Sequence, residues 1–177
     1  MSREEFDVAI IGGGVLGASL ARELTRWRVR VVVLDRAAEL PSGASRANSS
    51  MIHGGFDDSP NTLKARFCPE GNRMYHALKD ELDFHLDECG SYVCAFDDKD
   101  MAHLEKLLVQ GRANGVPGLE IVTGERLRGN EPNVSPDVKA ALWSPTEAIV
   151  NNFEAVVAFM ESAKINGAVL RLETRVT

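Results

Sequence analysis

Residues 7–35 read DVAIIGGGVLGASLARELTRWRVRVVVLD, and this stretch decides the fold. Residues 7–11 form a short apolar run without alternation, which is typical of a strand covered on both faces. Three glycines follow, then leucines at helical spacing, and a second apolar run at 31–34 ends on Asp35. The order strand, glycine turn, helix, strand predicts the βαβ unit that opens a dinucleotide-binding fold.

Three glycines of this turn have separate physical tasks. Gly12 permits the tight exit from the strand, Gly14 removes the Cβ that would block a pyrophosphate, and Gly17 lets the helix approach the sheet. The N–H groups of the first helical turn, around Val15 and Leu16, are then expected to point at the phosphates with the positive end of the helix dipole behind them.

Asp35 supplies the acid that such a fold places after its second strand. It stands 18 residues after Gly17, where a carboxylate can accept hydrogen bonds from both ribose hydroxyls of an adenosine half and disfavours a 2′-phosphate. A lone glycine pattern is a weak signal, but this one follows a strand, opens a helix and precedes a second strand that ends in an acid. We therefore predict a dinucleotide site, and the motif itself does not distinguish FAD from NAD.

A loop rich in small and hydroxyl side chains follows the second strand. Residues 41–50 read PSGASRANSS and lead into MIHGGFD at 51–57. This composition is typical of a solvated loop. It also supplies the small polar groups and backbone donors that an extended dinucleotide needs just past the strand ends, so both interpretations stand on the residues alone.

These segments together resemble the amino-acid-oxidase-like superfamily of FAD-dependent oxidoreductases. The resemblance is carried by residues 12–35, by GASRANS at 43–49 and by HGGFD at 53–57. Further motifs are similar to those of bacterial flavin-type glycerol-3-phosphate dehydrogenases: TLKAR at 62–66, EGNR at 70–73, NEPNVS at 130–135 and ALWSPT at 141–146. L-2-hydroxyglutarate oxidases share much of this pattern, so the resemblance is more specific for the superfamily than for the substrate.

The resemblance implies an α/β architecture, in which a Rossmann-like FAD-binding domain with a parallel sheet is combined with part of an α+β substrate domain. Residues 1–84 would be the first segment of the FAD-binding domain, residues 85–147 the first part of the substrate or cap domain, and residues 148–177 the second FAD-binding segment. It implies noncovalent FAD, held by a set of residues from the glycine turn, the second strand end, the following loop and the last strand: Gly12, Gly14, Val15, Leu16, Gly17, Asp35, Arg36, Ala44, Ser45, Asn48, Ser49 and Val176.

The activity implied by the resemblance is oxidation of glycerol 3-phosphate to dihydroxyacetone phosphate by hydride transfer to N5 of the flavin. The alternatives are a 2-hydroxy acid oxidase of the L-2-hydroxyglutarate type and an inactive nucleotide-binding fragment. His53 lies in the loop that would run beside the isoalloxazine ring, where a neutral imidazole could take the hydroxyl proton of the substrate. A histidine that only hydrogen-bonds the flavin or the backbone fits the same position.

Two departures from the family pattern stand out. The family usually has Glu where Asp35 stands, so the carboxylate is one methylene shorter. Pro69 falls inside an expected helix whose apolar positions form the stripe Leu63, Phe67, Gly71, Met74, Leu78 and Leu82. Because proline cannot donate to Ala65 and its ring crowds that carbonyl, we expect a kink or a helix that begins afresh near Pro69.

The remaining chain alternates between helical and extended patterns. We expect a strand over 90–96, a helix over about 98–113 and a half-buried strand over 119–122. A helix capped at 151–152, with a face of Phe153, Val156, Val157, Met160 and Ala163, should end at 166–167. By the resemblance, the strand at 168–176 joins the first two as the third parallel strand, and the backbone near Val176 faces the adenine.

The amino-acid composition limits the classes of partner that the protein can bind. The 177 residues carry 20 Lys+Arg against 26 Asp+Glu, for a net charge of -6, which argues against nucleic acid. Three cysteines without ligand spacing indicate neither disulfides nor a metal site.

With no leader pattern and no apolar run of membrane-spanning length, we expect a cytoplasmic protein, compatible with peripheral contact at the inner membrane face. The expected ligand is a small anionic substrate, and an electron-acceptor subunit or a homo-oligomer also fits.

We further expect the chain to be the amino-terminal part of a longer flavoenzyme, because the family's remaining sheet strands, most of its substrate domain and its second cofactor-binding stretch are not in it. Its first strand would then present an open edge that favours association. The isolated chain is expected to bind FAD weakly or not at all and to lack activity.

Overall fold

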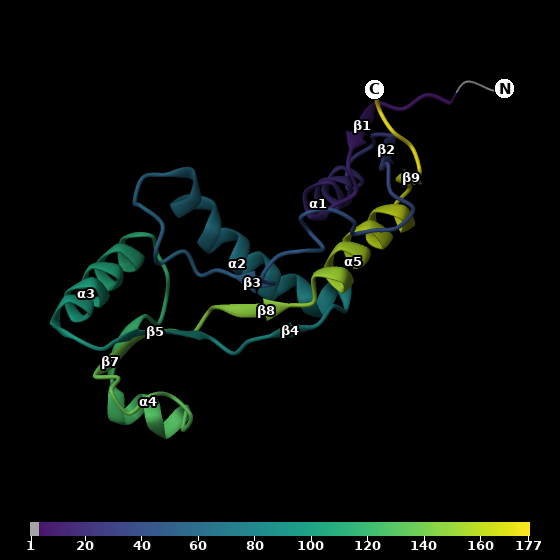
Figure 1. Ribbon diagram of the computed structural model, residues 1–177. Helices are drawn as coiled ribbons and strands as arrows, with labels where there is room; N and C mark the ends of the chain where they lie inside the picture. Colours follow the sequence, from purple (N-terminus) through teal and green to yellow (C-terminus); the bar gives the residue numbers. More distant parts are fainter. Residues whose placement is uncertain (1–3) are drawn as a thin grey trace. The chain divides into compact units, whose positions relative to one another are not determined.

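The computed structural model describes residues 4–177 and divides into two compact units (Figure 1). Unit 1 comprises residues 4–50, 78–85 and 150–177, and unit 2 comprises residues 51–77 and 86–149. The first three residues of the expected 1–84 segment lie outside the described residues. Residues 51–77 group with unit 2 rather than with the rest of that segment, and the division into cofactor and substrate domains stays a prediction.

Unit 1 is built on the expected parallel sheet. β1 (Val8–Ile11), β2 (Val31–Leu34) and β9 (Val169–Arg171) pair in the order β1-β2-β9, and α1 (Val15–Leu24) connects the first two. β2 lies in the middle and three of its four residues are buried, which agrees with a run of valines covered on both faces. The third strand is shorter than the expected 168–176, because Glu173 has a positive φ of 50° that ends the regular ladder.

Helix α1 packs closely against α5 (Asn152–Ile165) beside this sheet (Figure 1). The buried residues of α1 are the small residues Gly17, Ala18 and Ala21, which leave room for close packing. The Asn151 side chain accepts the N–H groups of Phe153 and Glu154, so the expected cap of α5 is confirmed.

The expected apolar face of α5 is partly wrong. Val156, Met160 and Ala163 are buried as expected, together with Ala155 and Phe159. Phe153 and Val157 are exposed. The buried face is therefore rotated toward Ala155 and Phe159, and Phe159 packs against Phe84.

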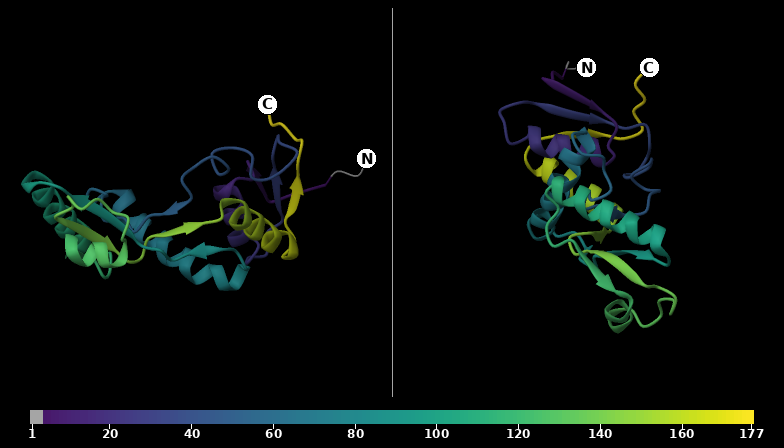
Figure 2. Two further views of the ribbon diagram at one scale, coloured as in Figure 1. Left: turned by 60° about the horizontal axis from the view of Figure 1, so that its bottom comes forward. Right: turned by 90° about the vertical axis from the view of Figure 1, so that its left-hand side faces the viewer.

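Unit 2 contains an antiparallel sheet of β5 (Ser91–Ala95), β7 (Ala140–Ser144) and β6 (Glu120–Thr123), in the order β5-β7-β6. Successive side chains of a strand point to opposite faces. Ala140 and Leu142 accordingly pack with Leu104 and Leu107 of α3 (Asp98–Ala113), whereas Ala141 packs with Leu127 of α4 (Gly124–Asn130). Figure 2 shows α3 and α4 on opposite sides of this sheet.

The bounds and the cap of α3 agree with the sequence. The helix spans residues 98–113 as expected, and the Asp97 carboxylate accepts the N–H of Asp100 at its N-terminus. Asp97 therefore caps α3, and Asp98 and Asp100 lie in its first turn, at the positive end of the helix dipole.

A second, small sheet joins β3 (Met51–Ile52), β8 (Ala148–Val150) and β4 (Leu86–Asp87), in the order β3-β8-β4. The sequence analysis does not foresee it. Strands of two or three residues are too short to carry a periodic pattern, so only the tertiary pairing, such as Met51 with Ile149, defines them.

Helix α2 (Leu63–Leu82) runs without interruption through Pro69, so a helix restart at this residue is wrong. Its expected apolar stripe is also wrong, because Leu63, Phe67 and Met74 are exposed. The buried face is instead Ala65, Pro69 and Asn72. Pro69 packs against Gly55, where an added Cβ would lie 2.8 Å from the proline Cδ, so its ring is used in a tertiary contact.

None of the helices described over residues 4–177 is both long enough and apolar enough to cross a lipid bilayer.

The close approach of α1 to its own glycine turn predicts the cost of a side chain there. A Cβ added at Gly17 would lie 1.9 Å from the carbonyl oxygen of Gly12. We expect Gly17→Ala to lower the free energy of unfolding by at least about 2 kcal/mol, because backbone must move to make room.

The matched control is Gly71→Ala, since a Cβ at Gly71 of α2 meets nothing within 4 Å. This change should raise stability by about 0.5–1 kcal/mol through helix propensity. Urea denaturation followed by circular dichroism measures both variants. Equal unfolding midpoints for the two would contradict the packing described for α1.

Candidate functional site

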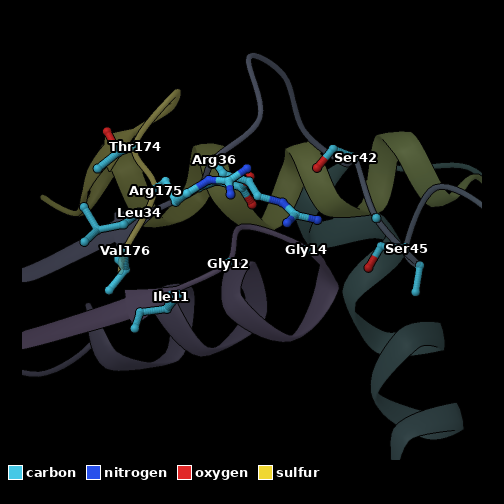
Figure 3. Close-up of a pocket in the computed structure, with 13 residues that line it drawn as sticks. Ile11, Gly12, Gly14, Leu34, Arg36, Ser42, Ser45, Thr174, Arg175 and Val176 are labelled. Atoms are coloured by element: carbon cyan, nitrogen blue, oxygen red, sulfur yellow. The ribbon is translucent and has the colours of Figure 1, made fainter.

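A pocket of about 490 Å³ lies in unit 1, at the carboxyl ends of β1 and β2 (Figure 3). It is lined by Gly12 and Gly14 of the glycine turn, by Asp35 and Arg36, and by the segments 42–45 and 174–176. Figure 3 shows Ser42 and Ser45 toward one end and Thr174 to Val176 toward the other. A ligand in a parallel sheet of this kind binds at the carboxyl ends of the strands, so the pocket lies where the fold predicts it.

The glycine turn brings backbone N–H groups to the pocket. Gly12 has a φ of +101°, which a residue with a side chain rarely adopts, and its N–H donates to Leu34 O at 2.8 Å. The N–H of Val15, in the first turn of α1, donates to Ser45 Oγ at 2.9 Å. A Cβ added at Gly14 would lie 2.9 Å from the same Oγ. The N-terminus of α1 therefore already attracts an oxygen acceptor, the type of group that a phosphate also supplies.

Asp35 has a structural task that the sequence analysis missed. Its side chain is buried, Oδ2 accepts the N–H of Gly13 at 2.7 Å, and Oδ1 accepts the N–H of Ala37 at 2.8 Å. These bonds join the end of β2 to the glycine turn. Because each carboxylate oxygen can accept two hydrogen bonds, both oxygens keep acceptor capacity toward the pocket.

Two arginines give the pocket positive charge. Arg36 was among the expected cofactor residues, and Arg175 was not. The sequence held only a weak signal for Arg175, its place at the end of an expected strand. Guanidinium groups are well matched to phosphate oxygens, so the charge distribution favours an anionic ligand.

Several expected cofactor residues do not line the pocket. Val15 is not a lining residue, although its N–H donates to Ser45 Oγ. Leu16 is exposed, and Gly17 is buried beneath Gly12. Asn48 organises its own loop, since its amide donates to Ala44 O at 3.0 Å and its Oδ1 accepts from Ser50 N and from Asn152 Nδ2. Ser49 is exposed in the same loop. Gly12, Gly14, Asp35, Arg36, Ala44, Ser45 and Val176 do line it, and the cofactor role of every residue in the set stays a prediction.

A separate candidate functional residue is His53, which lies in a loop of unit 2. The imidazole is about half exposed, and its Nδ1 lies 3.8 Å from Oε1 of the buried Glu147. Cys68 of α2 donates its S–H to His53 O at 3.5 Å. Burial, followed by the charge of Asp58, raises the pKa of the Cys68 thiol to about 11, so it is neutral at physiological pH. An exposed imidazole on a fixed loop can accept or release a proton.

His76 makes a second imidazole contact in this unit. Its Nδ1 lies 2.6 Å from Glu88 Oε1, and its Nε2 lies 2.9 Å from Thr146 O. His76 lies on α2 and Glu88 follows β4, twelve positions later, so no local spacing in the sequence signals the pair.

The pocket of unit 1 fits the adenosine diphosphate half of a flavin dinucleotide. Its lining includes Gly14 at the N-terminus of α1 and two guanidinium groups, and its acceptor is the Asp35 carboxylate at the end of β2. A helix N-terminus and guanidinium groups are the partners that phosphates require, and a carboxylate is the partner that ribose hydroxyls require. A Cβ at Gly14 would occupy the approach to the helix terminus.

Comparison with known proteins agrees with this chemistry. Residues 7–177 match the protein family described as FAD dependent oxidoreductase. The chain is 40% identical over 171 residues to a glycerol 3-phosphate dehydrogenase of Caloramator mitchellensis, which covers 97% of this chain and 36% of that protein. It is 32% identical to a mitochondrial L-2-hydroxyglutarate dehydrogenase of Nematostella vectensis, over 93% of this chain and 36% of that protein.

A solved structure is also similar. The L-alpha-glycerophosphate oxidase of Mycoplasma pneumoniae, with FAD bound, matches with a TM-score of 0.91 at 27% identity, over 99% of this chain and 46% of that one. The chain spans about a third of the length of the curated relatives it matches. The family match covers nearly every residue, and it confirms both the expected α/β fold and FAD as the cofactor. The chain therefore belongs to the family of FAD-dependent oxidoreductases.

Proposed function

We propose that the protein oxidises glycerol 3-phosphate to dihydroxyacetone phosphate. The observation that carries the proposal is the 40% identity, over 97% of this chain, to a protein named as glycerol 3-phosphate dehydrogenase. A TM-score of 0.91 to a glycerophosphate oxidase supports it. When bound, FAD would supply the acceptor for the hydride, which carries both electrons of such an alcohol oxidation.

The residues of unit 1 would hold the cofactor. In the proposal, the N-terminus of α1 at Gly14 and Val15, with Ser45, faces the pyrophosphate, and Arg36 and Arg175 offset its charge. Gly14, Arg36, Ser45 and Arg175 line one pocket, and the N–H of Val15 donates to Ser45 Oγ, which supports this assignment.

Asp35 would accept from the ribose hydroxyls with the acceptor capacity that its two backbone bonds leave. Its negative charge at that position would repel a 2′-phosphate.

His53 would act as the proton acceptor for the substrate hydroxyl. The exposed imidazole and its neutral thiol neighbour support a base that can meet a small molecule. The hydroxyl proton would pass to an imidazole nitrogen as hydride leaves the carbon that bears the hydroxyl group. Loss of one proton and one hydride leaves a ketone group with no change in the charge of the substrate. Should His53 only hydrogen-bond the flavin or the backbone, removal of its side chain would have a small effect on the chemical step.

L-2-hydroxyglutarate is the second candidate substrate. Several relatives carry that name, including the one that is 32% identical over 93% of this chain. Both candidates are small anions with a secondary hydroxyl group, so the same proton acceptor serves either. Side-by-side flavin reduction by glycerol 3-phosphate and by L-2-hydroxyglutarate distinguishes them.

The proposed cofactor site predicts that Gly14→Val weakens flavin binding. A Cβ alone would lie 2.9 Å from Ser45 Oγ, and the valine methyl groups would extend over the helix terminus. We expect FAD affinity in the holoenzyme to fall at least about tenfold, or about 1.4 kcal/mol. Flavin absorbance after dialysis measures the loss.

Gly129→Val is the matched control, because Gly129 is exposed on α4 and its added Cβ meets nothing within 4 Å. This variant should keep its flavin. If Gly14→Val also keeps its full flavin absorbance, the assignment of the glycine turn is wrong.

The proposed base predicts a slow chemical step in His53→Ala. General-base catalysis typically contributes about 10²–10⁴ to a rate, so flavin reduction by glycerol 3-phosphate in a single turnover should slow by at least about a hundredfold. Stopped-flow absorbance follows the reduction. His103→Ala, at an exposed position of α3, is the control and should reduce its flavin at the normal rate. A loss smaller than about tenfold in His53→Ala would leave this histidine with a structural role.

A further inference from the structure

The loop of residues 52–58, here called the His53 loop, is held by side chains from several other elements. Asn72 of α2 donates to Ile52 O, and Asn114, at the end of α3, donates to both Gly55 O and Asp58 O. Gln110 of α3 donates to Phe56 O. These partners sit on or beside regular helices, so the backbone that carries His53 is fixed from outside the loop.

Glu147 contributes the carboxylate of this arrangement. It lies in the turn between β7 and β8 and is only 3% exposed. Its Oε1 accepts the N–H of Gly54 at 3.1 Å, and its Oε2 accepts the hydroxyl of Ser91. A buried carboxylate is costly unless it is hydrogen-bonded, and these two donors offset that cost.

The backbone at Gly54 approaches the turn closely enough to make this possible. A Cβ added at Gly54 would lie 3.2 Å from the hydroxyl oxygens of both Ser144 and Thr146. The glycine thus brings the chain against the β7–β8 turn, and the neighbouring imidazole comes with it. His53 Nδ1 is left 3.8 Å from Glu147 Oε1, which is just beyond a hydrogen bond and within the range of an ion pair.

We propose that Glu147 is a positioning residue for His53, which holds the imidazole with Nδ1 toward the buried carboxylate. This inference rests on the proposed function, in which His53 accepts the substrate proton. A carboxylate beside Nδ1 favours the tautomer with its proton on Nδ1, so Nε2 is the nitrogen left to accept a proton. The same negative charge stabilises the imidazolium that forms when the hydroxyl proton arrives.

Other ionisable groups around the ring do not replace this carboxylate. Cys68, from α2, contacts the His53 carbonyl oxygen as a neutral thiol. Asp57 and Asp58, in the same loop, act on that thiol. The groups that face the loop from α3 are the uncharged amides of Gln110 and Asn114, and β5 contributes the hydroxyl of Ser91.

The sharpest variant is Glu147→Gln. A glutamine oxygen can still accept the N–H of Gly54, and its amide can donate to Ser91 Oγ, so the hydrogen bonds persist while the charge is removed. Without the carboxylate, no negative charge beside Nδ1 favours the tautomer that leaves Nε2 free or stabilises the imidazolium formed on proton transfer. The readout is flavin reduction in the holoenzyme. Flavin reduction at neutral pH should slow about tenfold or more.

Glu88→Gln is the matched control. It removes a carboxylate that lies 2.6 Å from the Nδ1 of a different histidine, His76, in the same unit. Its flavin should be reduced at the rate of the unmodified enzyme. If Glu147→Gln likewise keeps that rate, Glu147 does not position His53.

A second measurement needs neither turnover nor a variant. Nitrogen-15 NMR of the imidazole in the unmodified chain reports which ring nitrogen of His53 carries the proton. A majority with the proton on Nδ1 is the expected result, and a majority on Nε2 would overturn the inference even if Glu147→Gln fails to fold. Failure of the proposed function has a different signature, because His53→Ala would then reduce its flavin normally while the NMR tautomer remained as expected.

Discussion

The contact between Gly17 and the carbonyl of Gly12 is the constraint on which unit 1 depends. The helix begins so close to the strand that leads into it that no side chain fits between them. This proximity places the first N–H groups of α1 at the carboxyl end of β1, where the pocket lies. It also brings the turn within reach of Asp35, whose carboxylate holds the Gly13 N–H. One steric requirement thus sets the helix, the turn and the anion-binding terminus together.

The candidate residues of unit 1 and those of unit 2 are positioned by different means. In unit 1 the important groups are backbone N–H groups, whose direction follows from the start of a helix and needs no side chain. In unit 2 residues 53–58 of the His53 loop have no regular structure, and Asn72, Gln110, Asn114 and Glu147 hold the loop from other parts of the unit. A loop restrained in this way can present an exposed imidazole without the usual mobility of a surface loop.

The sequence predicted the elements that depend on short-range patterns. The βαβ unit, the bounds of α3 and the Asn151 cap each follow from spacings of a few residues, and the structure confirms them. Features set by distant contacts were missed. The buried face of α2 is Ala65, Pro69 and Asn72 because the His53 loop packs there, whereas hydrophobicity alone selected the opposite stripe. Glu147 is 93 residues from its partner Gly54, so no local pattern links the two.

The aspartate at position 35 holds the glycine turn and also lines the pocket. The carboxylate of an aspartate remains close to its own backbone, and here it accepts from Ala37 two residues ahead as well as from the glycine turn. An additional methylene would carry the oxygens farther toward the pocket but away from the Gly13 N–H. Because a buried N–H that loses its acceptor costs about 1–3 kcal/mol, the shorter side chain keeps the turn satisfied. The shorter side chain extends less far into the pocket, but its two backbone donors fix both carboxylate oxygens in one orientation at the edge of the pocket.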